Sequence, residues 1–335
     1  GSGEFLSQFC DYIYDNGYVY YLEHEAIMGK LAEKPNCDNL IDDFIEVVKK
    51  QASGNNPDRV NLKDFMERVG LNYKGYCSKR VRAVDKITEQ VQLNIKTANR
   101  TYIPGSALKG AIRTALVSYH YQDKGCVKNK NGYIGEDIFG SFGDDILKFL
   151  LVSDSDTFIE DDLKISKFYK LNLKSKKTDI PVTKEVIDKG VITTFIINCK
   201  AKKKQVANQF SYLCEGQEEK LLPIINEYSQ KNIEKELIEL QKGSGNEVEG
   251  IKDFYQSLLK AIKNNNLTKE AYLRIGAGKS FYDNTIAQKL SKESLNLIIK
   301  KNFEKANPNF FPKTRTIIME GLNIEVPGWI KISLS

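Results

Sequence analysis

The sequence predicts an α+β fold, built from layers of sheet and helix rather than as a barrel or a doubly wound parallel sheet. Short strand-like segments and helical segments are mixed along the chain, and few apolar runs are long enough for buried parallel strands. The length of 335 residues allows two domains of ordinary size. No repeat of solenoid period is present.

The composition excludes several function classes. Hydrophobic residues make up 41% and charged residues 28%, as in soluble globular proteins. No run approaches the ~18 apolar residues of a membrane span, so we expect a cytoplasmic protein with no membrane partner. The net charge of +6 is compatible with an anionic partner but does not establish one.

The number and spacing of the cysteines and histidines also limit the possible functions. Six cysteines are scattered without a C-x-x-C pair, which argues against a zinc ribbon and fits a reduced compartment. His24 and His120 are the two histidines, and two are too few for most catalytic sites built on histidine. We expect each to have a surface or helix-end role.

In the first half, the segment 11–22 (DYIYDNGYVYYL) predicts a hairpin around Asn16-Gly17. Apolar residues spaced three and four apart predict helices from about 23 to 70, interrupted by the loop ASGNNPD. The segment 86–97 alternates as a strand does, 125–145 is a glycine-rich loop, and 146–156 (ILKFLLVSDSD) is a buried strand with a polar end.

The second half uses similar elements. A β-branched strand is predicted at 191–201, followed by helices at 219–242 and 251–265 with GSGNEVEG between them. A helix at 292–306 precedes two closing strands, RTIIME and GWIKISL. The run Lys202-Lys203-Lys204 is expected to be a solvated hairpin tip.

The stretch TYIPGSALKGAIRTAL (101–116) combines a Pro104-Gly105 turn with a helix for which Ser106 is the expected N-cap. Leu108, Ile112, Ala115 and Leu116 form one apolar stripe. Lys109 and Arg113 lie four residues apart on the other side. A helix N-terminus with two nearby cations suits a phosphate. An ordinary amphipathic helix with a solvated Lys and Arg explains the pattern equally well.

The stretch YLRIGAGKSFYDNT (272–285) resembles a nucleotide-binding P-loop only superficially. The motif G-x-x-x-x-G-K-[ST] requires a glycine where this chain has Leu273, so we predict no ATPase site. The turn Gly276-Ala277-Gly278-Lys279 nevertheless can bring backbone amides and an ammonium group to a phosphate.

Several motifs together resemble the RAMP superfamily of CRISPR-associated proteins. The segment YIPGSALKGAIRTAL resembles the signature of that family. GSGE with the following hairpin, LLVSDSD, RIGAGKSFYDNT, and PKTRTIIMEG with VPGWIKISL resemble its other landmarks. Their order over nearly the whole chain is similar to that of the family branch that caps the crRNA 3′ end in type III-A Csm effector complexes.

The resemblance implies two ferredoxin-like (RRM-like) domains. The first covers 1–155, with a helical insertion near 23–70, and the second covers 156–335, with a helical segment and the glycine-rich loop. Family members carry a strand before the Gly1-Ser2-Gly3-Glu4 turn. We therefore expect this turn to be native, with its preceding strand outside the sequence, rather than a cloning scar.

The resemblance also implies a non-catalytic protein that needs neither a nucleotide cofactor nor a metal. Its partners would be the crRNA 3′ region, the adjacent RAMP backbone subunit and the small helical subunit, with target RNA contacted indirectly. Recruitment of host ribonucleases is left open. The expected RNA-binding residues are Gly1, Gly3, Gly105, Ser106, Lys109, Arg113, Gly276, Ala277, Gly278, Lys279, Lys313 and Arg315. Tyr282 or Phe311 is the expected base-stacking residue.

Three alternatives remain open at this point. Asp11 with a metal, or His24 as acid or base, would suit an endoribonuclease of the same superfamily, although SDSD (153–156) is more typical of a turn. The chain could instead be another RAMP subunit of the same complex, such as the one at the 5′ end. The third alternative is an RRM-like module with unrelated partners.

Overall fold

The computed structural model describes residues 3–53, 61–121, 135–141, 143–264, 269–308 and 311–334, and it has the predicted α+β character. Two compact units are present, each built from separate segments. The first comprises 1–102, 157–167 and 182–192, and the second comprises 103–156, 168–181 and 193–335. This is a division by compactness. The ferredoxin-like domains at 1–155 and 156–335 remain a prediction.

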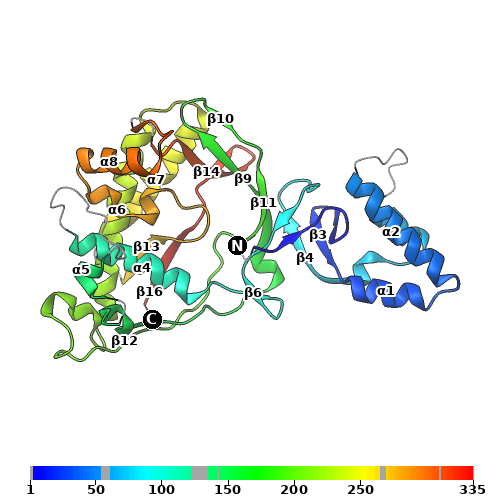
Figure 1. Cartoon of the computed structure of the whole chain (residues 1–335), viewed down its shortest axis with the longest axis horizontal. Helices are drawn as coiled ribbons and strands as arrows, with labels where there is room; N and C mark the ends of the chain where they lie inside the picture. The colour runs from blue at the N-terminus through cyan, green and yellow to red at the C-terminus, as the bar shows by residue number, and fades with distance from the viewer. Residues whose placement is uncertain are drawn as a thin grey trace. The chain divides into compact units, whose positions relative to one another are not determined.

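The first unit contains a mixed sheet whose strands are coloured from blue to green in Figure 1. In spatial order they are β1 (Phe5–Leu6), β5 (Val91–Gln92), β11 (Val182–Ile187), β9 (Leu163–Asn172), β4 (Cys77–Ala83), β3 (Tyr18–Leu22) and β2 (Tyr12–Asp15). The β5–β11 and β4–β9 pairs are parallel, whereas β2–β3, β3–β4 and β1–β5 are antiparallel. Strand β9 belongs to the first unit up to Lys167 and to the second from Phe168.

The predicted hairpin and helical insertion are confirmed. Asn16 and Gly17 take left-handed dihedrals (φ 47° and 80°), which a tight turn between twisted strands requires. Between β3 and β4 lie α1 (His24–Ala32), α2 (Cys37–Ser53) and α3 (Leu62–Arg68). Their apolar faces share one core with the hairpin residue Tyr20. Figure 1 shows α1 beside α2.

In the second unit, one core is built around α4 (Gly105–His120) and α6 (Leu221–Leu240). Two antiparallel pairs contribute to it, and their strands are β8 (Leu150–Val152), β12 (Ile197–Cys199), β13 (Glu270–Arg274) and β16 (Trp329–Ser333). The predicted apolar stripe of α4 is confirmed, because Leu108, Ile112, Ala115 and Leu116 are at most 1% exposed.

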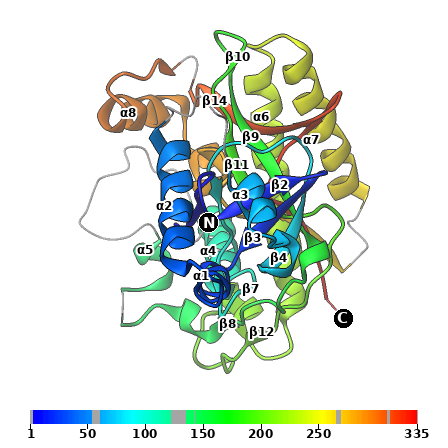
Figure 2. The same ribbon diagram turned by 90° about the vertical axis from the view of Figure 1, so that its right-hand side faces the viewer.

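A second core in this unit lies between α6 and α7 (Asn246–Asn264), which run side by side in Figure 2, and the strands next to them. Strand β14 (Thr314–Glu320) pairs antiparallel with β15 (Asn323–Glu325) and with the end of β9, which also pairs with β10 (Lys177–Thr178). The remaining elements are the hairpin β6 (Lys96–Thr97) and β7 (Arg100–Thr101) of the first unit, and the helices α5 (Glu136–Phe139) and α8 (Lys292–Asn302) of the second.

Several predicted strands were wrong in extent. The segment 86–97 is broken into β5 and β6, and only Ile197–Cys199 of 191–201 forms a strand. The predicted strand at 146–156 begins as a 3-10 turn, and the glycine-rich segment 125–145 lies partly outside the described residues. No helix in the described parts of the chain is long and apolar enough to cross a membrane.

Candidate nucleic-acid interface

Helix α4 begins two residues earlier than predicted. Pro104 precedes the helix, and the backbone amide of Gly105 donates to Asp154 Oδ1 at 2.8 Å. Ser106 is an exposed residue within the helix and not its N-cap, so that prediction was wrong. The Asp154 carboxylate, which follows β8, already accepts from the first helical amide and takes the part expected of Ser106.

Gly105 is required by the approach of α4 to β8. A Cβ atom at this position would lie 2.3 Å from Ser153 O and 2.5 Å from Val152 O, which are both backbone atoms. No L side chain fits there without displacing the strand. The glycine is therefore explained by packing within the protein and needs no RNA contact to account for it.

Lys109 and Arg113 lie in different environments. Arg113 Nη2 is 3.4 Å from Asp145 Oδ2, and its guanidinium lies over the Phe139 ring at 5.6 Å. Lys109 is half-buried and forms no ion pair with any residue that the structure describes. Of the two predicted cations on α4, Lys109 is the one without a carboxylate partner among the described residues.

A buried arginine fixes the glycine-rich loop that follows β13. Arg274 donates to Gly278 O at 2.8 Å, to Pro327 O at 3.0 Å and to Asp283 Oδ2 at 2.7 Å. The same Asp283 oxygen accepts from the Ser280 amide at 2.9 Å. These bonds hold both ends of the loop, so its shape is set before any ligand binds.

The two glycines of this loop serve different purposes. Gly276 is exposed and has φ +79°, a conformation that disfavours L side chains. Gly278 is buried, and a Cβ there would lie 2.7 Å from Pro327 Cγ. The first glycine permits the turn, and the second permits close packing of the loop on the Pro327 segment.

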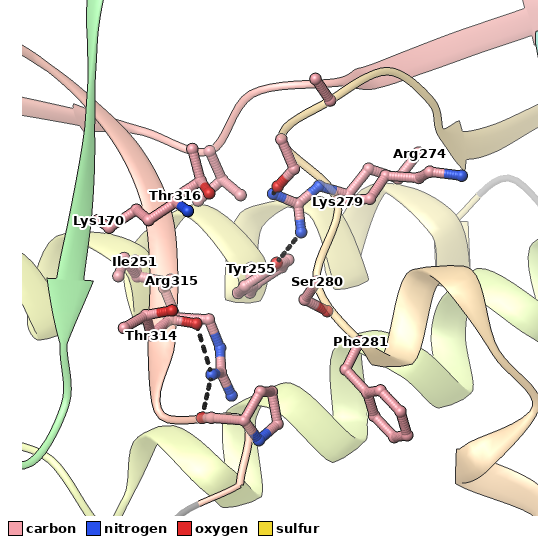
Figure 3. Close-up of a pocket in the computed structure, with 14 residues that line it drawn as sticks. Lys170, Ile251, Tyr255, Arg274, Lys279, Ser280, Phe281, Thr314, Arg315 and Thr316 are labelled. Carbon is pink, nitrogen blue, oxygen red and sulfur yellow. Dashed lines mark hydrogen bonds between the residues drawn. The ribbon is translucent and has the colours of Figure 1, made fainter. Parts of the chain in front are cut away.

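The loop forms one wall of a cavity of about 230 Å³ (Figure 3). The charged residues that line this cavity are all cations: Lys170, Arg274, Lys279 and Arg315. Hydroxyl groups of Ser280, Thr314 and Thr316 also belong to the lining. We call this space the basic cavity. Cations and hydroxyl donors without a lining carboxylate favour an anion such as a phosphate group.

Arg315 is buried in this cavity and keeps an unused donor. It is 4% exposed, and its Nε donates to Glu236 Oε2 at 2.6 Å. Its Nη1 donates to Pro312 O and Thr314 O, but its buried Nη2 has no hydrogen-bond partner among the described residues. The buried Ser280 Oγ likewise has none in the part of the chain that the structure describes. A buried unpaired donor is costly, so these two groups are well placed for a ligand.

Lys279 is the half-buried cation of the cavity. Burial lowers the pKa of its ammonium group, the positive charge of Arg274 acts in the same direction, and Asp283 partly opposes both. A bound anion would favour the charged form and oppose this shift. The positive charge of Lys279 is therefore only partly balanced by the negative charge of Asp283.

A wider hollow of about 730 Å³ adjoins the basic cavity along the chain, since Pro312 lines the cavity and its neighbours Phe311 and Lys313 line the hollow. We call it the outer hollow. Its charged residues are four lysines and one carboxylate: Lys174, Lys301, Lys305, Lys313 and Glu304. Its aromatic residues are Phe303 and Phe311. Tyr282 is not among them.

The prediction of Tyr282 as a base-stacking residue was wrong. Its side chain is 1% exposed, and its hydroxyl donates to Phe311 O at 3.3 Å. The ring belongs to a small core with Leu295 and Ile299. Phe311 is partly exposed and remains a candidate.

The structure therefore brings together part of the predicted set. Ala277, Gly278, Lys279 and Arg315 line the basic cavity, and Lys313 lines the outer hollow. Gly105, Ser106, Lys109 and Arg113 share α4 but line neither space, and Gly276 is an exposed residue of the loop that lines neither space. Gly3 (φ +82°) lies in the first unit, and Gly1 lies outside the described residues.

Sequence reasoning missed several contributors to both spaces. Lys170 comes from β9, which was not predicted, and Lys174 follows the same strand. Arg274 lies two residues before Gly276 of the glycine turn, and this position was the one sequence signal that could have identified it. Lys301 and Lys305 belong to a predicted helical segment that carried no other functional signal.

Comparison with known proteins defines the class. A model of the RAMP superfamily matches residues 81–281, more than half of the chain, so the chain belongs to the RAMP superfamily. The chain is similar to the CRISPR system protein Csm5 of Methanocaldococcus jannaschii, with 28% identity over 378 aligned positions that cover 100% of this chain and 86% of that protein.

Two solved structures share the fold. One is a chain of the cryo-EM structure of a Csm–crRNA–target RNA ternary complex of a type III-A CRISPR-Cas system, with a TM-score of 0.69, 21% identity, and coverage of 100% of this chain and 96% of that one. The other is the crystal structure of T. onnurineus Csm5, with a TM-score of 0.61, 19% identity, and coverage of 90% and 92%. At these identities the likeness establishes a common fold.

Proposed function

We propose that this chain is a crRNA-binding subunit of a type III-A Csm effector complex and that it holds the 3′ region of the crRNA through its phosphates. The observation that carries the proposal is the basic cavity, in which buried Arg315 keeps an unpaired Nη2 and the lining contains cations without carboxylates. The names of the similar proteins support the same assignment.

In this proposal a phosphate of the RNA enters the basic cavity. Lys279 and Lys170 supply charge, Arg315 Nη2 supplies a directed donor, and Ser280 supplies a hydroxyl. Arg274 acts indirectly, because its hydrogen bonds to Gly278 O and Asp283 hold the loop in place. Contacts to phosphate position a strand without reading its sequence, as a subunit that accepts any guide requires.

The outer hollow would accept the adjoining nucleotides. Phe311 and Phe303 offer aromatic faces on which an unpaired base can stack, and stacking tolerates every base. Lys313 and its neighbouring lysines would neutralise the backbone. Lys109 of α4 is a further phosphate contact in this proposal, whereas Arg113 mainly holds α4 against Asp145 and Phe139.

The finer role that we propose is to end the stack of RAMP backbone subunits and to define the length of the mature guide. The subunit would contact the last backbone subunit and the small helical subunit. It would not cut RNA itself. Its ferredoxin-like domains would be those that the family resemblance implies, at 1–155 and 156–335.

The experiment is a comparison of purified effector complexes carrying Lys170→Ala with Lys279→Ala, or the matched control Lys263→Ala with Lys269→Ala. The control pair removes the same charge from exposed lysines that line neither space. Subunit composition, crRNA occupancy and both crRNA ends are measured. We expect heterogeneous 3′ ends or loss of the subunit in the cavity variant, with intact 5′ tags in both.

Two outcomes would contradict the proposal. Altered 5′ tags with normal 3′ ends would assign the chain to the other end of the guide. Unchanged composition, occupancy and guide length in the cavity variant would show that the basic cavity does not hold crRNA.

A further inference from the structure

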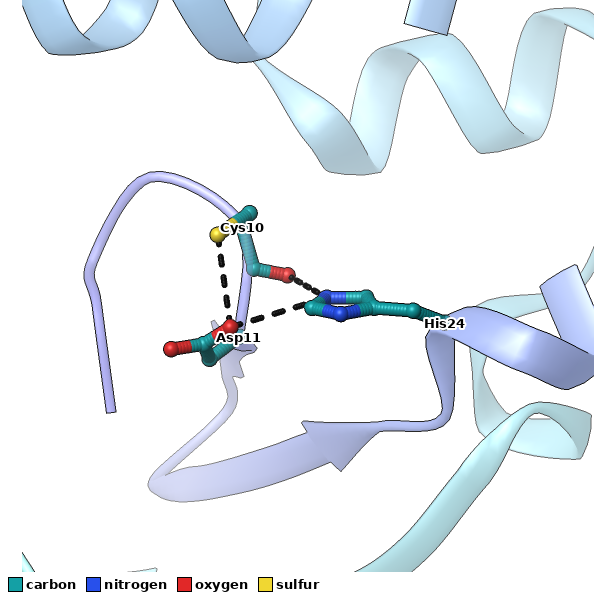
Figure 4. Close-up of side chains that lie close together, drawn as sticks. All are labelled: Cys10, Asp11 and His24. Atoms are coloured by element: carbon teal, nitrogen blue, oxygen red, sulfur yellow. Dashed lines mark hydrogen bonds and ion pairs between the residues drawn. The ribbon is translucent and has the colours of Figure 1, made fainter. Parts of the chain in front are cut away.

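Three side chains with metal-binding groups meet in the first unit, and none of them lines the basic cavity or the outer hollow. Cys10, Asp11 and His24 each offer one ligand atom, and these atoms all lie within 4.8 Å of one another (Figure 4). Cys10 Sγ lies 3.3 Å from Asp11 Oδ1, and His24 Nε2 lies 3.6 Å from the same oxygen. All three residues are partly exposed, so an ion can reach them from solvent.

These separations fit a tetrahedral zinc ion. Zinc binds thiolate at about 2.3 Å, imidazole at about 2.0–2.1 Å and carboxylate at about 2.0–2.2 Å, so neighbouring ligand atoms lie roughly 3.3–3.6 Å apart. The Cys10–Asp11 and Asp11–His24 distances are already in this range. The remaining pair of ligand atoms, from Cys10 and His24, lies within 4.8 Å.

Backbone hydrogen bonds of the β2–β3 hairpin hold these three residues close together. The β2–β3 hairpin pairs Tyr12 with Tyr21, and the amide of Leu22 donates to Asp11 O at 2.9 Å. This pairing places the start of α1, where His24 is the first residue, opposite the residues that precede β2. The three side chains are thus brought together by the hairpin and not by a flexible loop alone.

A hydrogen bond also orients the Asp11 carboxylate. Its Oδ2 accepts from the Ser7 amide at 2.7 Å, which leaves Oδ1 facing Cys10 and His24. His24 Nε2 lies 2.9 Å from Cys10 O, and binding of an ion through Nε2 would replace this contact. Partners that fix a carboxylate in this way are characteristic of metal sites.

We propose that Cys10, Asp11 and His24 bind a single Zn²⁺ ion or a similar transition-metal ion, with the fourth position open to water. The mixed sulfur, nitrogen and oxygen donors suit Zn²⁺ and not Mg²⁺, which requires six oxygen ligands. The ion would tie the turn before β2 to the N-terminus of α1. The site is independent of the basic cavity, and its loss leaves the residues of that cavity unchanged.

The test uses the purified full chain, made metal-free and titrated with Zn²⁺ by calorimetry and with Co²⁺ by absorption spectroscopy. We expect one ion per chain, and with Co²⁺ a thiolate charge-transfer band together with the visible bands of tetrahedral coordination. Cys10→Ser, Asp11→Asn and His24→Gln should each weaken binding at least about 100-fold, because even groups that only hydrogen-bond to a ligand contribute 10–100-fold. The control Cys37→Ser should bind as the unchanged chain does.

A measurement on the unchanged chain guards against variants that fold poorly. Zn²⁺ should protect Cys10 from alkylation, read by mass spectrometry, and should leave Cys37 as reactive as before. The proposal is overturned if the unchanged chain binds no Zn²⁺, if the Co²⁺ complex lacks the thiolate band, or if Cys10 is alkylated equally with and without Zn²⁺.

Discussion

Arg274 and Asp283 form an ion pair of 2.7 Å in which each side chain is only 3% exposed. The arginine also binds Gly278 O, and the carboxylate also accepts from the Ser280 amide. The two residues therefore clamp the glycine-rich loop from both sides. The turn that was predicted to bind phosphate therefore depends on a buried salt bridge.

Arg274→Ala should lower the free energy of unfolding by about 3–5 kcal/mol, because it leaves the Asp283 carboxylate buried without its cationic partner. Urea denaturation of the purified chain measures this change. The double variant Arg274→Met with Asp283→Leu removes both charges and should be clearly more stable than Arg274→Ala. If single and double variants are equally unstable, the cost does not come from the unpaired carboxylate.

Two glycines of α4 should respond oppositely to the same substitution. Gly105→Ala places a Cβ 2.3 Å from Ser153 O and should destabilise the chain by about 1–3 kcal/mol. Gly110 is exposed with no atom within 4 Å of its Cβ position, so Gly110→Ala should stabilise by roughly 0.5–1 kcal/mol. Thermal denaturation compares the two. Similar shifts in both variants would contradict the packing explanation for Gly105.

Local signals predicted the elements that depend on local chemistry. The Asn16-Gly17 hairpin, the helices between 23 and 70 and the apolar stripe of α4 all follow from neighbouring residues, and all are confirmed. Strands β4, β9 and β11 were missed. Their central pairings are parallel and join residues far apart in the chain, such as Arg82 with Lys164, so little in the local pattern marks them.

The same limit applies to the candidate site. The glycine turn and Lys279 were predicted from one short motif. Arg315, in contrast, was expected only to bind RNA and is buried against Glu236, which lies 79 residues earlier in the chain. A sequence shows that a cation is present but not which distant carboxylate neutralises it, and this distinction separates Lys109 from Arg113 as well.

Stacking and charge should be separable in RNA binding. Phe311→Leu keeps an apolar side chain but removes the aromatic face, and should weaken binding of single-stranded RNA by about 1–3 kcal/mol without changing its salt dependence. Lys279→Ala should reduce the slope of log K against log salt by about 0.7. Fluorescence anisotropy at several salt concentrations measures both. A change of slope in Phe311→Leu would show that this ring supports the lysines instead of stacking.

His120 should make the stability of the chain sensitive to mild acid. The ring is half-buried among Phe139, Phe210 and Tyr212, with Nε2 2.9 Å from the Tyr212 hydroxyl, and burial lowers its pKa from the ordinary value of 6.5. Below pH 6.5 the unfolded chain therefore takes up a proton that the folded chain resists, and the free energy of unfolding falls as the pH is lowered from that value through the depressed pKa.

The predicted fall in the free energy of unfolding can be checked by urea denaturation at pH 7.5 and pH 5.5, on the unchanged chain and on His120→Gln. Glutamine can keep a hydrogen bond to Tyr212 but does not titrate, so the variant should lose part of the stability difference between the two pH values. His24→Gln is the matched control, since His24 is the other histidine of the chain and is 40% exposed. If the difference is unchanged in His120→Gln and reduced in His24→Gln, the acid sensitivity arises in the first unit and not in the aromatic cluster at the end of α4.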